Sequence, residues 1–213
     1  MNKLRLVFEK GEAARYIGHL DVLRVFIRAL RRAELPVKYS AGFNPHALMT
    51  FALPLGVGVT SECELVDLAV TAEVPAGLVV TKLNAVLPTR GIRVNSAEYT
   101  EQPFAEIIRA EYVIVIQTDG APAVDALRDA LAAKEILVEK KSKKTVKEIN
   151  IMEHIFQSEI TDVSDDSVTL RAVISAGNTF NVKPQLVVAA LASAARGLNP
   201  IATAPCRKKF ITV

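Results

Sequence analysis

The chain has 213 residues, of which 50% are hydrophobic and 23% are charged, and its net charge is +3. This balance excludes an intrinsically disordered chain, and so mild a charge does not by itself point to nucleic acid. No apolar run approaches the ~18 residues of a membrane-spanning helix, and the opening "MNKLRLVFEK" lacks the apolar centre of a secretory signal, so we expect a cytoplasmic protein with no membrane partner.

The first two elements follow from two hydrophobic periods. Residues 3–10 alternate apolar and polar side chains, and this period of two predicts a half-buried strand. Residues 20–33 carry apolar side chains at helical spacing, and Pro36 closes the helix. The expected buried faces are Leu4, Leu6 and Phe8 in the strand, and Leu20, Leu23, Ile27 and Leu30 in the helix.

The rest of the chain continues the alternation of strands and helices. A turn-rich stretch at 37–58 follows the first helix, and each half of the chain supplies the order β-α-β-β-α-β. The further elements are expected, in chain order, as a strand at 63–74, a helix at 75–88, strands at 91–100 and 109–118, a helix at 121–136, strands at 136–140 and 145–151, a hairpin at 155–177, a helix at 183–200 and a strand at 206–213.

This order predicts an α+β protein made of two ferredoxin-like (βαββαβ) units in tandem. The units would span residues 1–103 and 104–213 and join near Pro103, and each would have an ordinary domain size. The duplication rests on element order, because the two halves show no repeat in their sequences. The alternative architecture is one continuous mixed sheet with four helices.

Several well-known sites have no counterpart in the sequence. It contains no phosphate-binding Gly-x-x-x-x-Gly-Lys loop, no dinucleotide-binding Gly-x-Gly-x-x-Gly and no Gly-x-Ser-x-Gly nucleophile elbow. The two cysteines, Cys63 and Cys206, are far apart and form no Cys-x-x-Cys pair. We therefore expect no cofactor, no disulfide framework and no thiolate metal site.

A row of arginines occupies one face of the expected first helix. Arg24, Arg28, Arg31 and Arg32 follow Asp21 at spacings of 3, 7, 10 and 11 residues, away from the leucine stripe. The row is either a solvated face, in which Asp21 pairs with Arg24 or Arg28, or a stripe that contacts phosphate through paired guanidinium donors. Both interpretations stay open.

Two other segments are candidates for contact with RNA. The stretch 37–58 interleaves aromatic and small polar side chains, as in an ordered loop that presents them to a partner, although Phe43 in the core is the alternative. From Lys134 to Lys147, six lysines stand against two glutamates, which predicts a second basic surface. The candidate RNA-binding residues outside the arginine row are Tyr39, Ser40, Phe43, Asn44, His46, Lys140, Lys141, Lys143 and Lys144.

Two histidines, His19 and His46, are the candidates for catalysis. They would act as general acid and base if they met at one site, whereas His19 is also interpretable as a residue that packs the helix entry. Together with Asp21, Glu62 or Glu64 they supply enough donor atoms for a metal ion. Their spacing does not require a metal, and we expect no tightly bound one.

Two pieces of the sequence, "HLDVLR" and "SAGFNPH", carry a resemblance to a known family. From Tyr16 to Leu68 the chain resembles the bacterial radical-SAM-linked proteins, whose function is uncharacterised. Members of that family accompany, or are fused to, a radical S-adenosylmethionine (radical SAM) protein, so the resemblance implies such a partner. The residues that match the pattern are His19, Leu20, Asp21, Arg24, Ser40, Gly42, Phe43, Asn44, Pro45 and His46.

The sequence departs from this family pattern at three positions. Ala47 and Gly56 stand where prolines are commoner, and Asn150 stands where a lysine-rich stretch usually ends in an acidic residue. The chain has no Cys-x-x-x-Cys-x-x-Cys, so the partner would hold the iron–sulfur cluster and perform the radical chemistry. The expected element order is also similar to that of RNA-processing proteins with paired ferredoxin-like units, including the CRISPR repeat endoribonucleases.

The leading hypothesis is an accessory protein that binds a structured RNA and presents it to a radical SAM partner. Two alternatives stay open. One is an RNA-processing or RNA-modifying enzyme that uses His19 and His46. The other is a protein-interaction module whose basic face docks the radical SAM partner.

Overall fold

The computed structural model describes residues 3–141 and 146–213. Within these residues the protein is α+β, with four α-helices and mostly antiparallel β-sheet. The chain divides into two compact units, Met1–Glu106 and Ile107–Val213, so the boundary falls just after Pro103. None of the helices in the described residues is long and apolar enough to cross a membrane.

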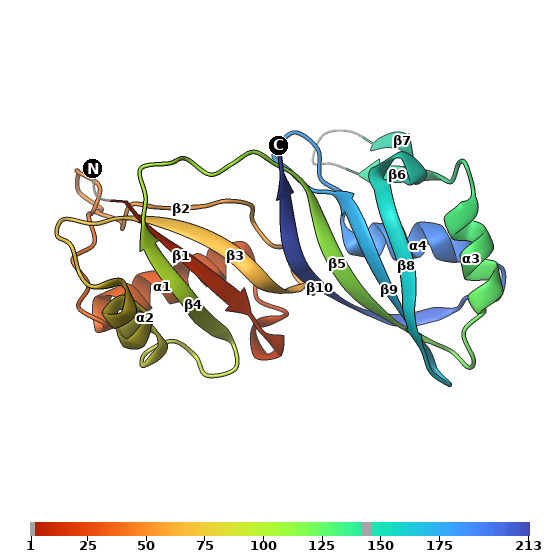
Figure 1. The fold of residues 1–213 in the computed structure, drawn as a ribbon, viewed down its shortest axis with the longest axis horizontal. Coiled ribbons are helices and arrows are strands. Elements are labelled where there is room, and N and C mark those ends of the chain that lie inside the picture. Colours follow the sequence, from red (N-terminus) through yellow and green to blue (C-terminus); the bar gives the residue numbers. More distant parts are fainter. Residues whose placement is uncertain (1–2, 142–145) are drawn as a thin grey trace. The chain divides into compact units, whose positions relative to one another are not determined.

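The first unit is an antiparallel sheet with two helices (Figure 1). Strand β1 pairs with β3 on one side and with β4 on the other, and β2 pairs with the far edge of β3, which gives the order β4-β1-β3-β2. The elements are β1 (Lys3–Lys10), the 3-10 helix η1 (Glu12–Ala14), α1 (His19–Arg32), β2 (Met49–Phe51), β3 (Thr60–Ala69), α2 (Ala76–Asn84) and β4 (Ile92–Tyr99).

The core of the first unit lies between the sheet and its helices. Leu4, Leu6 and Phe8 are buried, as the alternation of β1 predicts, and they pack with buried residues of α1 and α2. The ring of Phe8 meets that of Phe26 edge-to-face, with 4.9 Å between centroids. Arg5 of β1 and Asp67 of β3, which stand opposite each other in the register and alternate with these core residues, therefore point to the other face of the sheet, which the helices do not cover.

The expected buried stripe of α1 is wrong over most of its length. Leu20 is 63% exposed, Leu23 and Ile27 are only half-buried, and Leu30 alone lies in the core. The helix is apolar around much of its circumference, so its periodicity allows two overlapping stripes. Contact with the sheet selects the stripe centred on Phe26.

The second unit repeats the antiparallel strand arrangement with an added hairpin. Its main sheet has the order β10-β5-β9-β8, and β6 pairs only with β7 in a separate two-stranded sheet. The elements are β5 (Ile107–Thr118), α3 (Val124–Ala132), β6 (Leu137–Lys141), β7 (Val146–Asn150), the 3-10 helix η2 (Ile151–His154), β8 (Ile155–Val163), β9 (Ser167–Ser175), α4 (Pro184–Ala194) and β10 (Pro200–Thr212).

Strand β10 begins at Pro200, six residues before the expected strand at 206–213. The sequence does not reveal this earlier start, because Pro200 and Pro205 argue against β-structure. Proline donates no hydrogen bond to a ladder and normally marks an edge or an irregularity. Strand β10 nevertheless pairs with β5 from Pro200 to Thr212, and its register shifts between Pro200 and Ala202. The irregularity lets the strand start at a proline.

The base of the β6–β7 hairpin is fixed by Asn150, one of the positions that departs from the family pattern. Its side-chain oxygen accepts hydrogen bonds from the backbone N–H of Ile136 at 3.1 Å and of Met152 at 3.2 Å. Its amide nitrogen donates to the carbonyl of Lys134 at 3.2 Å. A carboxylate would keep the two accepted bonds and lose the donated one, so the amide has a structural reason here.

Candidate nucleic-acid interface

The stretch after α1 forms a narrow loop whose two ends are hydrogen-bonded together. Tyr39 and Ala47 form an isolated β-bridge, and the N–H of Leu48 donates to the carbonyl of Lys38 at 2.8 Å. The N–H of Ser40 donates to the carbonyl of His46 at 2.9 Å. We refer to residues 40–46 as the 40–46 loop.

Side chains of the 40–46 loop reinforce its closure. The Ser40 hydroxyl oxygen lies 2.8 Å from Nδ1 of His46 and accepts a hydrogen bond from the backbone N–H of His46 at 3.1 Å. Gly42 has φ +113°, a value that side-chain-bearing residues rarely adopt, so glycine makes the turn possible. Phe43 is fully exposed and Asn44 is exposed, whereas Tyr39 is 36% exposed at the base. The core alternative for Phe43 is therefore wrong.

The arginine row lies entirely on the surface. Arg24, Arg28, Arg31 and Arg32 are all exposed, because they occupy the side of α1 opposite Phe26. Asp21 accepts a hydrogen bond from Arg24 at 2.8 Å, a pair on an exposed helix surface that contributes little stability. The arginine row thus includes one locally paired member.

The arginine row and the 40–46 loop are joined by a short connection. Arg31 and Arg32 lie in the last turn of α1. The 40–46 loop begins at Ser40, eight residues after Arg32, the last residue of the helix. Arg32 donates to the carbonyl of Val86 at 3.4 Å, which holds it at this end of the unit. Guanidinium groups and an exposed aromatic ring thus come from consecutive segments of the first unit.

The two candidate catalytic histidines do not share a cavity. His19 begins α1 and packs edge-to-face on Phe51, with 4.9 Å between ring centroids, on the helix-covered face of the sheet. His46 lines a larger cavity together with Thr50, and the residues that line the cavity beside His19 are entirely different. Because successive strand residues point to opposite faces, Phe51 and Thr50 mark two sides of the sheet.

The cavity beside His46 lies on the helix-free face of the first unit and has a volume of about 400 Å³. Its floor comes from β2, β3 and the segment before β2, and its rim includes charged side chains that the sequence analysis did not select. The lining residues are Lys3, His46, Ala47, Leu48, Met49, Thr50, Asp67, Leu68, Ala69 and Glu101.

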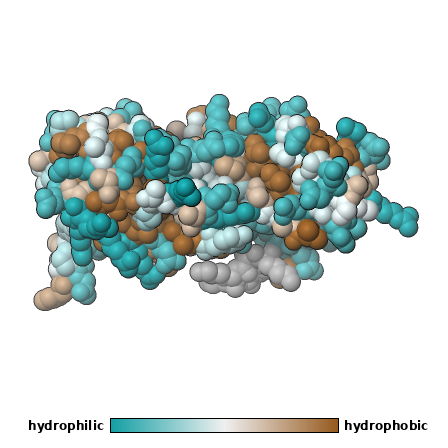
Figure 2. Space-filling view, turned by 90° about the horizontal axis from the view of Figure 1, so that it is seen from below, coloured by the Kyte–Doolittle hydropathy of each residue, from teal (hydrophilic) through white to brown (hydrophobic). Residues whose placement is uncertain are grey.

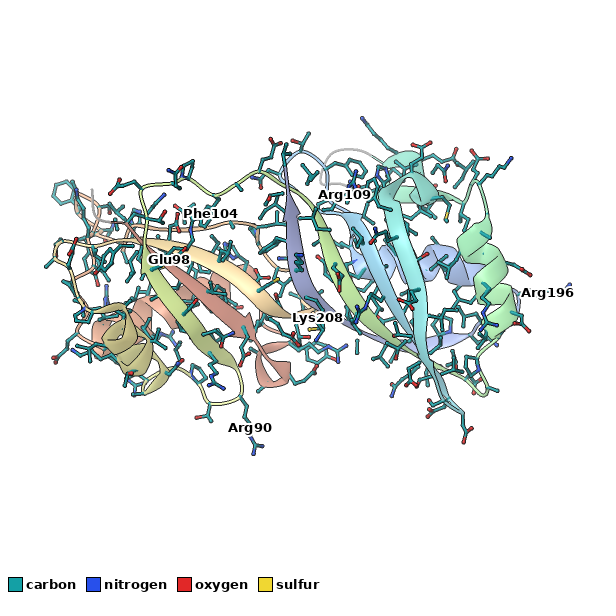
Figure 3. All side chains as sticks on the ribbon, in the orientation of Figure 1. Arg90, Glu98, Phe104, Arg109, Arg196 and Lys208 are labelled. Atoms are coloured by element: carbon teal, nitrogen blue, oxygen red, sulfur yellow. The ribbon has the colours of Figure 1, made fainter. Side chains whose placement is uncertain are left out.

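Asp67 is the buried anchor of this cavity. Arg5 donates two hydrogen bonds to its carboxylate, at 2.7 and 2.9 Å, and Nζ of Lys3 lies 3.4 Å away. The hydrogen bond to Asp67 raises the pKa of the Arg5 guanidinium above its ordinary value. Arg5 also lies over the ring of Phe104, 4.3 Å from its centroid. Phe104, which is labelled in Figure 3, belongs to the segment after β4. A charged residue inside the apolar run "ELVDLAV" is the sequence signal that could have identified Asp67.

The second unit has its own cluster of basic and aromatic side chains. Nζ of Lys140 lies 3.4 Å from the ring centroid of Phe180, and the His154 ring stacks on Phe180 with 4.2 Å between centroids. Nδ1 of His154 lies 3.1 Å from the Ser175 hydroxyl oxygen. Lys141 pairs through its backbone with Val146. The expected candidates Lys143 and Lys144 lie outside the described residues.

Both titratable groups of this cluster have shifted pKa values. Burial lowers the pKa of Lys140. Burial also lowers the pKa of His154, and the charge of Lys140 adds to this effect while that of Glu153 opposes it. Lys140 and His154 therefore lose their protons at a lower pH than exposed lysine and histidine side chains do.

The pKa of His154 gives a testable pH dependence. Because the unfolded chain binds this proton more tightly than the folded chain, His154 stabilises the fold above the ordinary histidine pKa of about 6.5, and this stability is lost as the pH falls toward the lowered value. Replacing Lys140 with glutamine should raise the pKa of His154 part of the way back, since burial remains. An NMR titration of the three histidines, assigned with a His154→Gln variant, measures this. An unchanged His154 pKa in the Lys140→Gln variant would show that the two groups do not interact.

No cluster of three or more histidine, cysteine, aspartate or glutamate side chains suited to a metal occurs in the described residues. The face drawn in Figure 2 is largely hydrophilic, and its hydrophobic residues lie in separate patches. The surface features that carry the candidate residues are the 40–46 loop, the arginine row, the 400 Å³ cavity and the Lys140 cluster.

Comparison with known proteins adds a family and a fold. The family model described as "Uncharacterized protein conserved in bacteria (DUF2344)" matches residues 3–184. No curated protein matches the chain.

The solved structures that resemble the chain in fold include the following two. A chain of a Cbf5-Nop10-Gar1 complex has a TM-score of 0.55 and 12% identity, over 98% of this chain and 48% of that chain. A chain of an H/ACA RNP bound to a substrate RNA containing 2'-deoxyuridine has a TM-score of 0.51 and 12% identity, over 96% of this chain and 47% of that chain. The protein thus spans about half the length of the chains that it resembles. At this identity the likeness concerns the fold alone.

Proposed function

Because the chain belongs to a bacterial family of uncharacterized proteins (DUF2344), we propose its function from its own surface: it is an accessory protein that holds a structured RNA for a radical SAM partner enzyme. The observation that carries the RNA-binding part is the fully exposed Phe43 on a hydrogen-bonded loop that follows the arginine row.

The physical argument for RNA rests on two complementary kinds of contact. Exposed arginines attract phosphates of any sequence and release counterions, which supplies most of the non-specific affinity. An exposed aromatic ring on an ordered loop offers a platform on which an unpaired base stacks. A loop of RNA with unstacked bases presents both groups together, so a structured RNA fits the surface better than a plain duplex. Lys140 and Lys141 in the second unit are further candidate contacts.

The fold comparisons support an RNA-associated role without identifying one. One of the two similar structures is an H/ACA RNP bound to a substrate RNA. The strand orders β4-β1-β3-β2 and β10-β5-β9-β8 each follow from a β-α-β-β-α-β path, the latter with the β6–β7 hairpin inserted. We therefore interpret the protein as two ferredoxin-like units in tandem, a plan found in other RNA-binding proteins.

A non-catalytic role fits the site better than an enzymatic one. His19 and His46 line separate cavities, so they offer no common position for a reacting group. The radical SAM partner is proposed from the "HLDVLR" and "SAGFNPH" resemblance. The cytoplasmic location stays a prediction.

The RNA-binding proposal is tested with the purified 213-residue chain. Electrophoretic shifts with cellular RNA at about 50 mM and 200 mM salt should show binding that weakens steeply as salt increases. Absence of a shift at the lower concentration would reject RNA binding and favour a module that docks the partner protein directly.

The partner is tested separately. Affinity purification of the tagged chain from its own cells, followed by mass spectrometry, should recover a radical SAM protein, both before and after ribonuclease treatment. Recovery of RNA without any radical SAM protein would remove the partner from the proposal and leave the RNA-binding role intact.

A further inference from the structure

The 400 Å³ cavity on the helix-free face has the size of a small-ligand site. Its floor is partly apolar, with Leu48 and Ala69 on the helix-free face, and its rim is polar, with Lys3 and Glu101 among the charged members. An apolar floor with a few polar groups at the rim is the composition of sites that bind flat, partly polar molecules.

The rim of the cavity is held in place before any ligand arrives. The N–H of Thr100 donates to the carbonyl of Lys3 at 3.0 Å, and the carbonyl of Gln102 accepts a hydrogen bond from Arg5 at 3.0 Å, so both neighbours of Glu101 are fixed. Across the cavity, the contact between Ser40 and Nδ1 of His46 orients the imidazole and leaves Nε2 as its other polar atom. A fixed rim favours binding because little further ordering is needed.

Charge at the cavity selects against phosphate. Two positively charged side chains, Lys3 and Arg5, and two negatively charged ones, Asp67 and Glu101, lie at the cavity, so their charges cancel. The carboxylate of Asp67 is already engaged by Arg5 and Lys3. Glu101 is exposed and makes no hydrogen bond or ion pair with the residues that the structure describes, so its two oxygens are available as acceptors. The cavity therefore suits a neutral group with paired N–H donors.

Guanine is the RNA base that meets this requirement. Its Watson–Crick edge carries two adjacent donors, N1–H and the N2 amino group, which match the two oxygens of one carboxylate, and uracil has no such pair. We propose that the cavity receives an unpaired guanine, whose donor edge binds Glu101 and whose face packs over Leu48 and Ala69. This inference rests on the proposed RNA-binding function, and it adds base selectivity to it.

The test compares stem-loop RNAs that differ at one base. The reference probe has a loop made only of uridines. In a first series of probes, one guanosine replaces the uridine at each loop position in turn. In a second series, inosine, which lacks the N2 amino group, replaces the uridine at the same positions. With the wild type, the best guanosine probe should bind about 10-fold more tightly than the all-uridine probe, and inosine should lose much of this gain. In the Glu101→Gln variant the guanosine-to-uridine ratio should fall to about one.

The ratio is the decisive readout, because removal of a negative charge raises the affinity for every RNA. Glu135→Gln, which changes an exposed glutamate of the second unit, is the matched control and should keep the wild-type ratio. A wild type that binds all probes equally, or a Glu101→Gln variant that keeps its preference for guanosine, would overturn the inference while RNA binding itself stands.

A second experiment uses free guanosine. It tests the guanine site independently of RNA binding, and it shows whether a free nucleoside can occupy the cavity. NMR signals of His46 and of the Leu48 methyl groups should shift when guanosine is added to the wild type, and should not shift with uridine or in the Glu101→Gln variant. If these shifts occur and no RNA binds, the cavity takes a free guanine nucleoside and the RNA function is rejected. If no shifts occur and the RNA probes show no preference, the guanine site is rejected.

Discussion

Replacing Phe43 with alanine is expected to weaken RNA binding by about 1–3 kcal/mol, the usual contribution of one base stacked on an aromatic ring. The change should leave the melting temperature unaltered, because the fully exposed ring makes no core contact. It should also leave the salt dependence of binding unchanged, since stacking releases no counterions. Electrophoretic shifts at two salt concentrations, with a melting curve of each protein, measure all three quantities.

The matched control for Phe43 is another exposed aromatic residue of the same unit. Tyr16 is 74% exposed and lies before α1, away from the 40–46 loop in the sequence, so Tyr16→Ala should bind RNA as the wild type does. Equal losses in the two variants would show that exposed aromatic surface in general, and not a specific stacking platform, holds the RNA. A loss of stability in Phe43→Ala would mean that the loop tip packs against another part of the protein.

Replacing Arg24, Arg28 and Arg31 together with glutamine is expected to weaken binding by about 10- to 100-fold at low salt. Each lost phosphate contact should reduce the slope of log affinity against log salt by about 0.7 to 0.9, so three contacts should reduce it by about 2 to 3. The fold should survive, because the three side chains are exposed on the far side of α1 from its core residues. Titrations at four or five salt concentrations give the slope directly.

The chain contains a close structural match for one member of the arginine row. Arg24 pairs with Asp21 at 2.8 Å, and Arg128 of α3 pairs with Asp125 at the same spacing and distance, with both arginine side chains 63% exposed. Arg24→Gln should therefore reduce the salt slope and Arg128→Gln should not. If the two substitutions act alike, the arginine row contributes only through net charge.

The hydrophobic patterns predict where most strands and helices lie and fail on details that tertiary contacts decide. The alternation of β1 correctly gives Leu4, Leu6 and Phe8 as buried. The same reasoning selects the wrong stripe of α1, because two apolar stripes overlap there and only the position of the sheet decides between them. At β10, pairing along the whole of β5 outweighs the local preference of two prolines.

The candidate site is predictable only where its residues are close in sequence. Ser40, Phe43 and His46 lie within seven residues, so their composition alone indicates a presenting loop. The pair of Arg5 and Asp67 joins strands 62 residues apart, and Glu101 reaches the same cavity from a third segment. The spacing of residues along one sequence does not reveal these contacts, because they depend on the register in which β1 pairs with β3.

The closed base of the 40–46 loop also has a kinetic consequence. A disordered segment loses backbone entropy worth about 1–2 kcal/mol per residue when it binds. Hydrogen bonds between Ser40 and His46 have already restricted this loop during folding. Association should then be limited by collision and electrostatic steering and not by a slow ordering step, and an altered loop tip should reveal itself mainly in how long the complex lasts.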